Sequence, residues 1–263
     1  MQKNSSADFV GSALRLVPDQ AGQAGSAFFK QGLSINSTSD FSTEFTFQIT
    51  YEPDPNVVRD EEDFSDGLAF VVQGTGPGFI GYDGESLGYR NGPLDQIYFY
   101  AIEFDTHYNS NTGDVSPSGN EVAITRTRRG EPHEPPVVTD VIDSVDLSAG
   151  PNPRPLLDNG ELKNVRIEYG FHGDNRRLSV FLSEGPGIPT PQLVLQTILT
   201  DNLFHFGGDS TYLGFTASTG DGHAHHDIFS WTFNVPEPGA LSLFGIAGLV
   251  LVAARQKGKA GSA

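Results

Sequence analysis

Large apolar residues recur at alternate positions over residues 41–49, as in Phe45, Phe47 and Ile49, with polar residues between them. This period of two predicts a β-strand with one buried face. Shorter runs rich in β-branched and aromatic residues, bounded by turn-forming residues, extend the prediction along the chain. We predict further strands at residues 67–72, 97–105, 121–126, 165–169, 178–182, 212–217 and 228–233.

Turn-forming residues separate these strands. The tripeptide Gly-Asp-Asn at residues 173–175 lies between two of them and predicts a β-hairpin. Pro-rich polar stretches at residues 131–136 and 150–155 predict surface loops. A chain of this kind is expected to close into two packed antiparallel sheets, an all-β sandwich or jelly roll over residues 1–234. Function is then expected on the loops at one rim.

Composition supports a turn-rich β protein with one main core. The 263 residues include 31 Gly, 17 Pro and 19 Phe, and only 19% are charged. The formal net charge of −17 argues against binding of nucleic acid, which needs clustered Lys and Arg. Because the chain has no cysteine, its stability is expected to come from the core and from a bound metal rather than from disulfides.

The C-terminal segment differs from the rest of the chain. Residues 239–254 form an uncharged apolar run, somewhat shorter than the roughly 20 residues of a typical membrane-spanning helix. We expect a short hydrophobic helix within a tail at residues 235–257, followed by a polar end at residues 258–263. The flanking residues are Pro236, Glu237 and Pro238 on one side and Arg255, Lys257 and Lys259 on the other.

This tail resembles the PEP-CTERM sorting signal of Gram-negative bacteria, which implies processing by an exosortase during export. A plain C-terminal membrane anchor is the alternative. Both place the main domain outside the cytoplasm, because Lys and Arg tend to stay inside. The resemblance implies a protein of the cell surface, outer envelope or extracellular matrix, held transiently in the membrane. Residues 1–10 lack a basic-then-apolar signal segment, so we expect that the natural start lies further upstream.

Acidic and amide side chains cluster where one predicted strand ends. Glu103 and Asp105 are two residues apart, so on a strand their carboxylates face the same side. Asn109 and Asp114 follow in the polar loop directly after that strand. Carboxylate, amide and carbonyl oxygens are the ligands of hard cations such as Ca²⁺. The segment therefore predicts a metal site.

At these residues the chain resembles the legume-type (L-type) lectins. The metal loop beginning Glu-Phe-Asp-Thr at Glu103 is one matching motif, and others lie in the family's order over residues 9–234. The resemblance implies a concanavalin A-like jelly-roll sandwich that binds sugar with Ca²⁺ and has no catalytic activity. The other motifs are residues 22–29 (GQAGSAFF), 66–74 (DGLAFVVQG), 84–88 (GESLG) and 213–233 (LGFTASTGDGHAHHDIFSWTF).

The resemblance also implies a set of metal ligands. Ca²⁺ is expected on Asp105, the backbone carbonyl of His107, Asn109 and Asp114. A second, Mn²⁺-type site would use Glu103 with Asp105 and Asp114. Glu121, or alternatively Asn120, stands where the family has a histidine, and a carboxylate suits a hard ion better than a transition metal. Occupation of the second site therefore stays open.

For sugar, the family pattern implies Asp66 as an acceptor of ligand hydroxyls, Asn109 as a donor and a backbone N–H near Gly84. Glu85 stands where the family usually has glycine, and could crowd the pocket or add an acceptor. The side chains of Tyr108 and Tyr82 are the candidate platforms for the apolar face of a sugar. Residues 220–224 correspond to the family's variable specificity loop, where Asp221 and His223 are expected to make polar contacts.

Two alternatives use the same fold. Laminarinase-type hydrolases need two catalytic carboxyl groups about 5 to 5.5 Å apart. Thr106, His107 and Tyr108 follow Asp105, so the strand offers no second glutamate and hydrolysis is disfavoured. A structural matrix protein that binds no sugar is the other alternative. The main hypothesis is an exported, Ca²⁺-dependent lectin whose partners are glycans such as exopolysaccharide. Homo-oligomers are possible.

Overall fold

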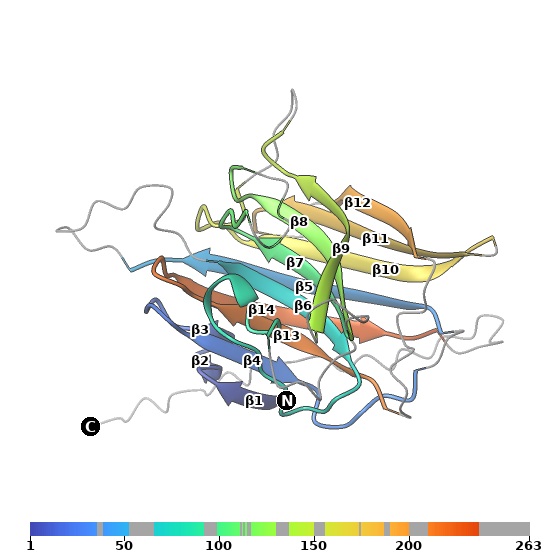
Figure 1. Ribbon diagram of the computed structural model, residues 1–263, viewed down its shortest axis with the longest axis horizontal. Helices are drawn as coiled ribbons and strands as arrows, with labels where there is room; N and C mark the ends of the chain where they lie inside the picture. The colour runs from blue at the N-terminus through green and yellow to red at the C-terminus, as the bar shows by residue number, and fades with distance from the viewer. Residues whose placement is uncertain are drawn as a thin grey trace, which may run out of the picture.

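The computed structural model of this protein describes residues 1–35, 39–52, 66–91, 99–110, 112, 114, 117–129, 137–149, 156–173, 175–186, 190–199 and 210–236. These residues form two stacked antiparallel sheets (Figure 1). In spatial order, the front sheet contains β1 (Gln2–Ser5), β4 (Ala24–Phe28), β13 (Tyr212–Ser218), β6 (Gly67–Gln73), β7 (Phe99–Asp105), β8 (Glu121–Arg129) and β9 (Val137–Asp146). The back sheet contains β12 (Gln192–Leu199), β11 (Asn175–Glu184), β10 (Lys163–His172), β5 (Phe41–Thr50), β14 (His225–Asn234), β3 (Ala13–Val17) and β2 (Asp8–Val10).

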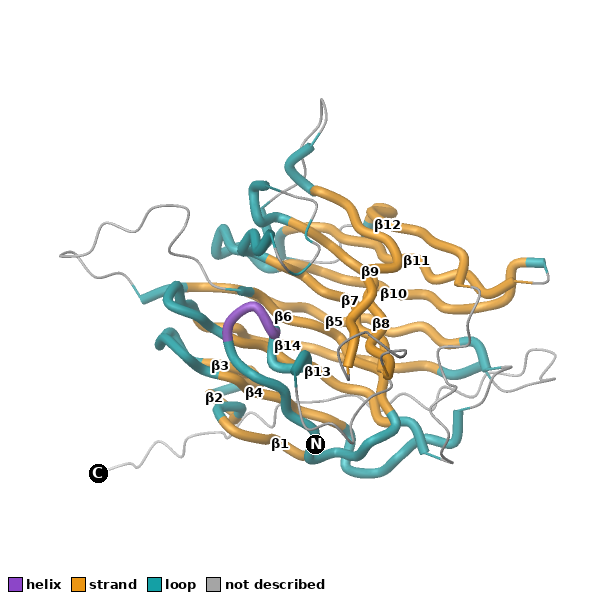
Figure 2. Tube along the Cα trace, in the orientation of Figure 1, coloured by secondary structure: helices purple, strands orange, loops and turns teal. Residues whose placement is uncertain are grey.

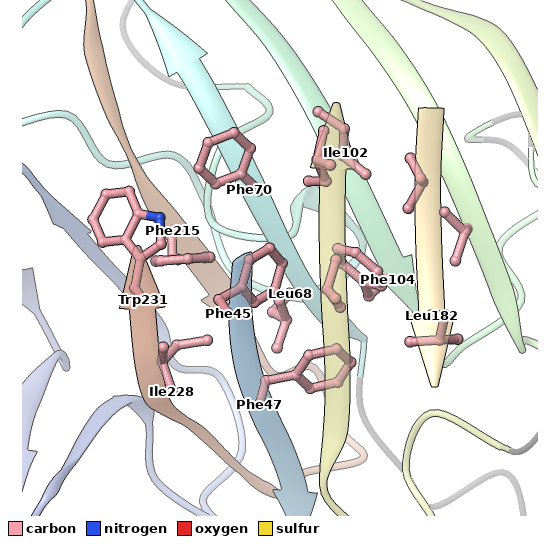
Figure 3. Close-up of a cluster of buried hydrophobic side chains, with 14 of the residues drawn as sticks. Phe45, Phe47, Leu68, Phe70, Ile102, Phe104, Leu182, Phe215, Ile228 and Trp231 are labelled. Carbon is pink, nitrogen blue, oxygen red and sulfur yellow. The ribbon is translucent and has the colours of Figure 1, made fainter. Parts of the chain in front are cut away.

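The main core lies between the sheets and is rich in aromatic rings. The period of two predicted for β5 is confirmed, because its buried and more exposed residues alternate along the strand. Phe45 of β5 packs edge-on against Phe104 of β7 and Phe215 of β13, with ring centroids 5.8 and 4.9 Å apart. Trp231 of β14 meets Phe215 at 4.9 Å. Figure 3 shows these side chains pointing into the same layer.

A smaller core lies on the other face of the front sheet. The segment 76–91 folds over that face and contains the 3₁₀ turn η2 (Gly84–Ser86), drawn purple in Figure 2. Phe79, Leu87 and Tyr89 of this segment pack against Phe99 and Ala101 of β7. Every residue of β7 is therefore buried, including the outward-facing Glu103 and Asp105.

The all-β sandwich predicted from the sequence is confirmed, as is the hairpin at residues 173–175, where His172 of β10 pairs with Asn175 of β11. The chain adds six strands that the sequence pattern did not predict, namely β1, β2, β3, β4, β9 and β12. The predicted surface loops at residues 131–136 and 150–155, the tail from residue 237 onward and its apolar helix lie outside the described residues. Within the part of the chain that the structure describes, no helix is long and apolar enough to span a membrane.

Candidate functional site

Strand register brings the predicted site residues to one rim of the front sheet. Gly67, the first residue of β6, pairs with Asp105, the last residue of β7. On its other side Gly67 pairs with Ser218, the last residue of β13, and Asp105 also pairs with Glu121, the first of β8. Asp66, the metal loop after Asp105 and the loop after Ser218 therefore leave the sheet at neighbouring points.

Hydrogen bonds fold the metal loop back onto its own carboxylates. The His107 N–H donates to Asp105 Oδ1 at 2.9 Å. The Asn109 N–H donates to Asp114 Oδ2 at 2.7 Å, and the Thr112 hydroxyl donates to Asp114 Oδ1, also at 2.7 Å. The loop also contacts its neighbours, because the Thr106 N–H donates to the Asp66 carbonyl at 3.3 Å. The loop thus gathers the expected Ca²⁺ ligands and links them to Asp66.

Electrostatics at the loop favour a cation. Burial raises the pKa of Asp105 well above its usual range, and repulsion by Asp114 and Glu103 raises it further. A buried carboxylate close to two other carboxylates is stabilised when a cation neutralises it. The donor set of two carboxylates with amide and carbonyl oxygens fits Ca²⁺.

Glu103 has a partner that the sequence did not predict. Arg90 Nη2 donates to Glu103 Oε1 at 2.5 Å, and Arg90 Nε lies 3.1 Å from the same oxygen. The Tyr89 hydroxyl donates to this oxygen as well. Burial lowers the pKa of Arg90, but the charge of Glu103 and the contacts with Tyr89 raise it well above its ordinary value. The guanidinium is therefore charged.

The expected second metal site does not fit this arrangement. Its set of Glu103, Asp105, Asp114 and Glu121 needs the carboxylate that Arg90 holds. Among the described residues, no group of three or more histidine or acidic side chains is arranged to hold an ion. The Ca²⁺ set is compatible with that result, because only two of its donors are carboxylates. The donors thus suit one hard cation rather than two ions.

Asp66 is a further buried acid of the rim. The residue is only 5% exposed, and its Oδ2 has no hydrogen-bond partner among the described residues. Burial raises the pKa of Asp66 above its ordinary value, although hydrogen bonds from its own N–H and from Gly220, and the nearby His107, oppose that shift. A buried acceptor without a donor is costly, so this oxygen is suited to a hydroxyl group supplied by a ligand.

A hollow of about 470 Å³ lies next to Asp66, which is not itself a lining residue but adjoins Gly220, which is. A Cβ atom added to Gly220 would lie 3.2 Å from Asp66 Oδ2 and 3.6 Å from the Gly84 Cα. The two glycines therefore leave room for a ligand to approach the carboxylate. The lining residues are Ala21, Gly22, Asp83, Gly84, Gly220 and Asp221.

The loop that carries Gly84 is fixed to β13 and the residues after it. Ser218 Oγ donates to the Gly84 carbonyl at 2.6 Å, and the Gly84 N–H donates to the Thr219 carbonyl at 3.2 Å. Thr216 Oγ1 donates to the Leu87 carbonyl at 2.7 Å. Leu87 itself has a positive φ of 48°, which the turn at η2 requires. These bonds set the width of the hollow before any ligand arrives.

The loop between β3 and β4 forms the opposite wall, which the sequence did not predict. The Gly22 N–H donates to the Gly220 carbonyl at 3.0 Å. His223 was expected to face the sugar, but its Nδ1 lies 2.5 Å from Asp19 Oδ1, and it does not line the hollow. Asp221, the other residue expected to contact a sugar, lines the hollow. His223 therefore holds the two loops together.

The remaining predicted residues divide by burial. Glu121 is 2% exposed at the start of β8, next to Asp105. Tyr108 is exposed on the metal loop, where it is available as a platform for a sugar ring. Glu85 lies within η2 and is half-buried, and it is not among the residues that line the hollow. The structure thus places Tyr108 where a ligand can reach it, and places Glu121 among the buried acids.

Adding a side chain at Gly220 should weaken ligand binding without unfolding the protein. Replacing Gly220 with Ala puts a methyl group 3.2 Å from Asp66 Oδ2. We expect glycan affinity to fall roughly 10-fold, because the pocket loses space for a hydroxyl group. Titration calorimetry at saturating Ca²⁺ checks this, with Gly78→Ala as the control, since a Cβ at Gly78 meets no atom within 4 Å. Unchanged glycan affinity in Gly220→Ala would place the ligand elsewhere.

Comparison with known proteins agrees with this geometry. Residues 1–241 match the family described as "Legume lectin domain". The "L-type lectin-domain containing receptor kinase S.7" of Oryza sativa subsp. japonica is 32% identical over 203 residues, which cover 74% of this chain and 24% of the kinase. This chain therefore spans about a quarter of that relative's length.

Solved lectin structures share the fold. Peanut lectin with a 9mer peptide aligns with a TM-score of 0.64 at 20% identity, covering 90% of this chain and 92% of the lectin. The exoplasmic/lumenal domain of VIP36, in a Ca²⁺/Man-bound form, aligns with a TM-score of 0.60 at 15% identity, covering 91% and 84%. With the match over residues 1–241, these findings mean that the chain belongs to the legume lectin domain family.

Proposed function

We propose that this protein is a Ca²⁺-dependent glycan-binding protein whose ligand enters the hollow beside Asp66. The proposal rests on Asp66 Oδ2, a buried hydrogen-bond acceptor that has no donor among the described residues. Gly84 and Gly220 lie next to it and leave space for a ligand. The metal loop is joined directly to Asp66 through the Thr106 N–H. A polyol offers hydroxyl donors that suit such a carboxylate.

Each group at the rim has a role in this proposal. Asp66 Oδ2 accepts a sugar hydroxyl, and the side chain of Asn109 donates to another. Asp105, Asp114, Asn109 and the His107 carbonyl would hold Ca²⁺, which supplies the positive charge that fixes the metal loop. Tyr108 offers an exposed ring to the apolar face of the sugar. The solved domain of VIP36 in its Ca²⁺/Man-bound form supports this combination of ion and sugar on the shared fold.

Binding is favoured over hydrolysis by the state of Glu103. A glycosidase needs a carboxyl group that can reach the scissile bond. Glu103 is 1% exposed, and its carboxylate is held by Arg90 and Tyr89 below the segment 76–91. Glu103 is therefore not available to a bound sugar, which supports a protein without catalytic activity.

The proposal predicts that Asp66→Asn loses glycan binding and keeps Ca²⁺ binding. The variant keeps the shape of the side chain but loses the charge that strengthens the hydrogen bond. Hydrogen bonds to charged groups are worth about 1.5 to 3 kcal/mol, so glycan affinity should fall about 10- to 100-fold. Calorimetry with Ca²⁺ and then with a glycan separates the two losses. Full glycan affinity in Asp66→Asn would contradict the role of this carboxylate.

The same carboxylate sets an acid limit on glycan binding. Only ionised Asp66 accepts hydroxyl hydrogens with both oxygens, and burial raises its pKa above the ordinary 3.8. As pH falls through that raised value, the wild-type protein should lose glycan affinity, and Asp66→Asn should show no such step. The pH profile is measured at saturating Ca²⁺, with Ca²⁺ occupancy followed separately.

The hollow also indicates which glycans to test. Asp83 and Asp221 are exposed on its walls, and together with Asp66 they make it acidic. Neutral glycans should therefore bind better than polymers of uronic acids, because like charges repel across a pocket. A glycan array with neutral and acidic members, read with and without Ca²⁺, tests the proposed function. The absence of any Ca²⁺-dependent glycan would leave a structural matrix protein as the better hypothesis.

For the tail we propose export by the sorting route that its sequence resembles. Support comes from Pro236, Glu237 and Pro238, the apolar run at 239–254 and the basic residues that follow. A surface or matrix location in a Gram-negative bacterium would give the lectin access to exopolysaccharide. Cell fractionation with and without residues 235–263 tests it, and an unchanged distribution would count against it.

A further inference from the structure

We propose that the guanidinium of Arg90 takes the place of a second metal ion, so that the metal centre of this protein holds one divalent cation. The inference rests on the proposed Ca²⁺ site and concerns the acids beside it. Glu103 lies two residues before Asp105 on β7, on the same face of the front sheet. Its negative charge is compensated by a side chain of the protein itself.

The geometry of the pair is that of a fixed, buried counter-charge. Arg90 is 5% exposed and Glu103 is 1% exposed, so water does not screen them. Both Nε and Nη2 of Arg90 reach Glu103 Oε1. The Arg90 Nε also donates to the Tyr89 hydroxyl at 2.9 Å, and that hydroxyl meets Thr125 Oγ1 of β8 at 2.8 Å. Breaking such a pair would leave a lone charge in the interior.

Charge accounting at the centre explains why one ion is enough. Glu103, Asp105, Asp114 and Glu121 bring four carboxylates to adjacent positions on β7, β8 and the metal loop. One Ca²⁺ and one guanidinium leave a single negative charge among them. Arg90 and Tyr89 both contact Glu103 Oε1, so a second divalent ion would have to displace the guanidinium or bind beside its buried positive charge. Displacement would leave Arg90 buried without its acid, and binding beside it would bring like charges together. The pair therefore opposes a second ion.

The same arginine connects the metal centre to the sugar loop. Arg90 lies one residue before the end of the segment 76–91, which carries Gly84, and its carbonyl accepts the Tyr82 N–H at 3.2 Å. The adjacent Tyr89 packs into the small core against Phe99 of β7, with ring centroids 5.5 Å apart. A guanidinium on this loop thus fixes the loop to β7 whether or not metal is present. The wall of the hollow that holds Gly84 should keep its position in the metal-free protein.

The test counts ions in the wild-type chain and in variants of Arg90. Metal-stripped protein is titrated with Ca²⁺ and then with Mn²⁺ by calorimetry, and bound metal is measured after dialysis. Arg90→Leu removes the charge and keeps an apolar side chain, whereas Arg90→Lys keeps the charge. Arg128→Leu, which removes an arginine from a half-exposed pair with Asp140, is the matched control. Thermal melts with and without Mn²⁺ give a second readout that does not depend on glycan.

We expect one Ca²⁺ per wild-type chain and no added Mn²⁺. In Arg90→Leu we expect a second ion, seen as Mn²⁺ binding and as a rise in Tm on adding Mn²⁺, and neither effect in Arg90→Lys or Arg128→Leu. Two ions in the wild type overturn the inference. An Arg90→Leu protein that binds no Mn²⁺ also overturns the inference. The same conclusion holds if Arg90→Leu stays unfolded in Mn²⁺ while the double variant Arg90→Leu with Glu103→Gln folds. No ion at all in the wild type instead overturns the proposed Ca²⁺ site.

Discussion

Replacing Asp105 with Asn should abolish Ca²⁺ binding and, with it, glycan binding. Asp105 is buried at the point where β7 enters the metal loop, and its Oδ1 already orients the His107 N–H at 2.9 Å. The amide keeps the volume but loses the charge that attracts the cation. Because loss of a supporting residue around a metal ligand costs about 10- to 100-fold in affinity, loss of a ligand should weaken Ca²⁺ binding at least about 100-fold.

The stability of Asp105→Asn distinguishes lost binding from unfolding. Burial, Asp114 and Glu103 raise the pKa of Asp105 in the metal-free fold above the ordinary 3.8. For a raised carboxyl pKa, the stabilising effect of the proton is complete below the ordinary value and is lost as pH rises through the folded value. At neutral pH the charge therefore destabilises the metal-free wild type. Asp105→Asn without metal should melt at the same temperature or higher.

The measurement pairs calorimetry with thermal melts. The control is Glu44→Gln, an exposed acid on β5 in the back sheet, which should keep both affinities. Ca²⁺ binding of wild-type strength in Asp105→Asn would show that the loop does not use this carboxylate. A metal-free Asp105→Asn protein that melts well below the wild type would show that Asp105 stabilises the fold without an ion.

Replacing Gly67 with Ala should damage the fold and the site together. Gly67 has a φ of +110°, which L residues with a side chain rarely adopt. A Cβ there would lie 2.2 Å from the Phe104 carbonyl oxygen and 3.1 Å from the Asp105 Cα. Strain of about 1 to 3 kcal/mol and a packing clash of about 1 to 3 kcal/mol add to roughly 4 kcal/mol. That corresponds to a fall in Tm of roughly 10 °C.

The substitution should also weaken Ca²⁺ and glycan binding, because Gly67 lies between Asp66 and Asp105. It follows Asp66 in sequence and pairs with Asp105 across the sheet. Relief of the clash must move β6 away from β7 at the rim, so both Ca²⁺ and glycan affinity should fall even where the protein stays folded. Gly78→Ala is the control, because its Cβ would enter open space. Equal melting temperatures for the two variants would contradict the close approach of the strands.

Local sequence patterns predicted eight interior strands and missed the four edge strands, together with the short interior strands β3 and β4. β3 and β4 have only five residues each, and buried residues follow one another along them without a period of two. β5 alternates strictly and was predicted within one residue of its observed end. β9 has intermediate burial along its length, because it is an edge strand of the front sheet, and its sequence has no period of two. β12 is an edge strand of the back sheet and follows a stretch rich in Gly and Pro. Edge strands bury too little to leave a clear apolar pattern.

The residues of the site also divide into those that the sequence predicted and those that it did not. Asp105 and Asp114 follow a predicted strand closely, so their meeting in one loop could be predicted, whereas Asp66 was expected at the site only through the resemblance to the family. Arg90 carried no such signal, because its partner Glu103 is reached only when the segment 76–91 folds over β7. His223 was predicted to face the sugar, but a loop from the other side of the hollow supplies Asp19 as its partner. Contacts between loops that are far apart in the sequence cannot be predicted from local sequence patterns.

The most direct test of a Ca²⁺-dependent lectin is an ordered calorimetric titration of the full chain. Metal-stripped protein is titrated with a glycan chosen from the array, then with Ca²⁺, and then with the glycan again. The account predicts no heat of glycan binding before Ca²⁺, one Ca²⁺ bound per chain, and glycan binding only afterwards. Glycan binding of equal strength before and after Ca²⁺ would contradict it.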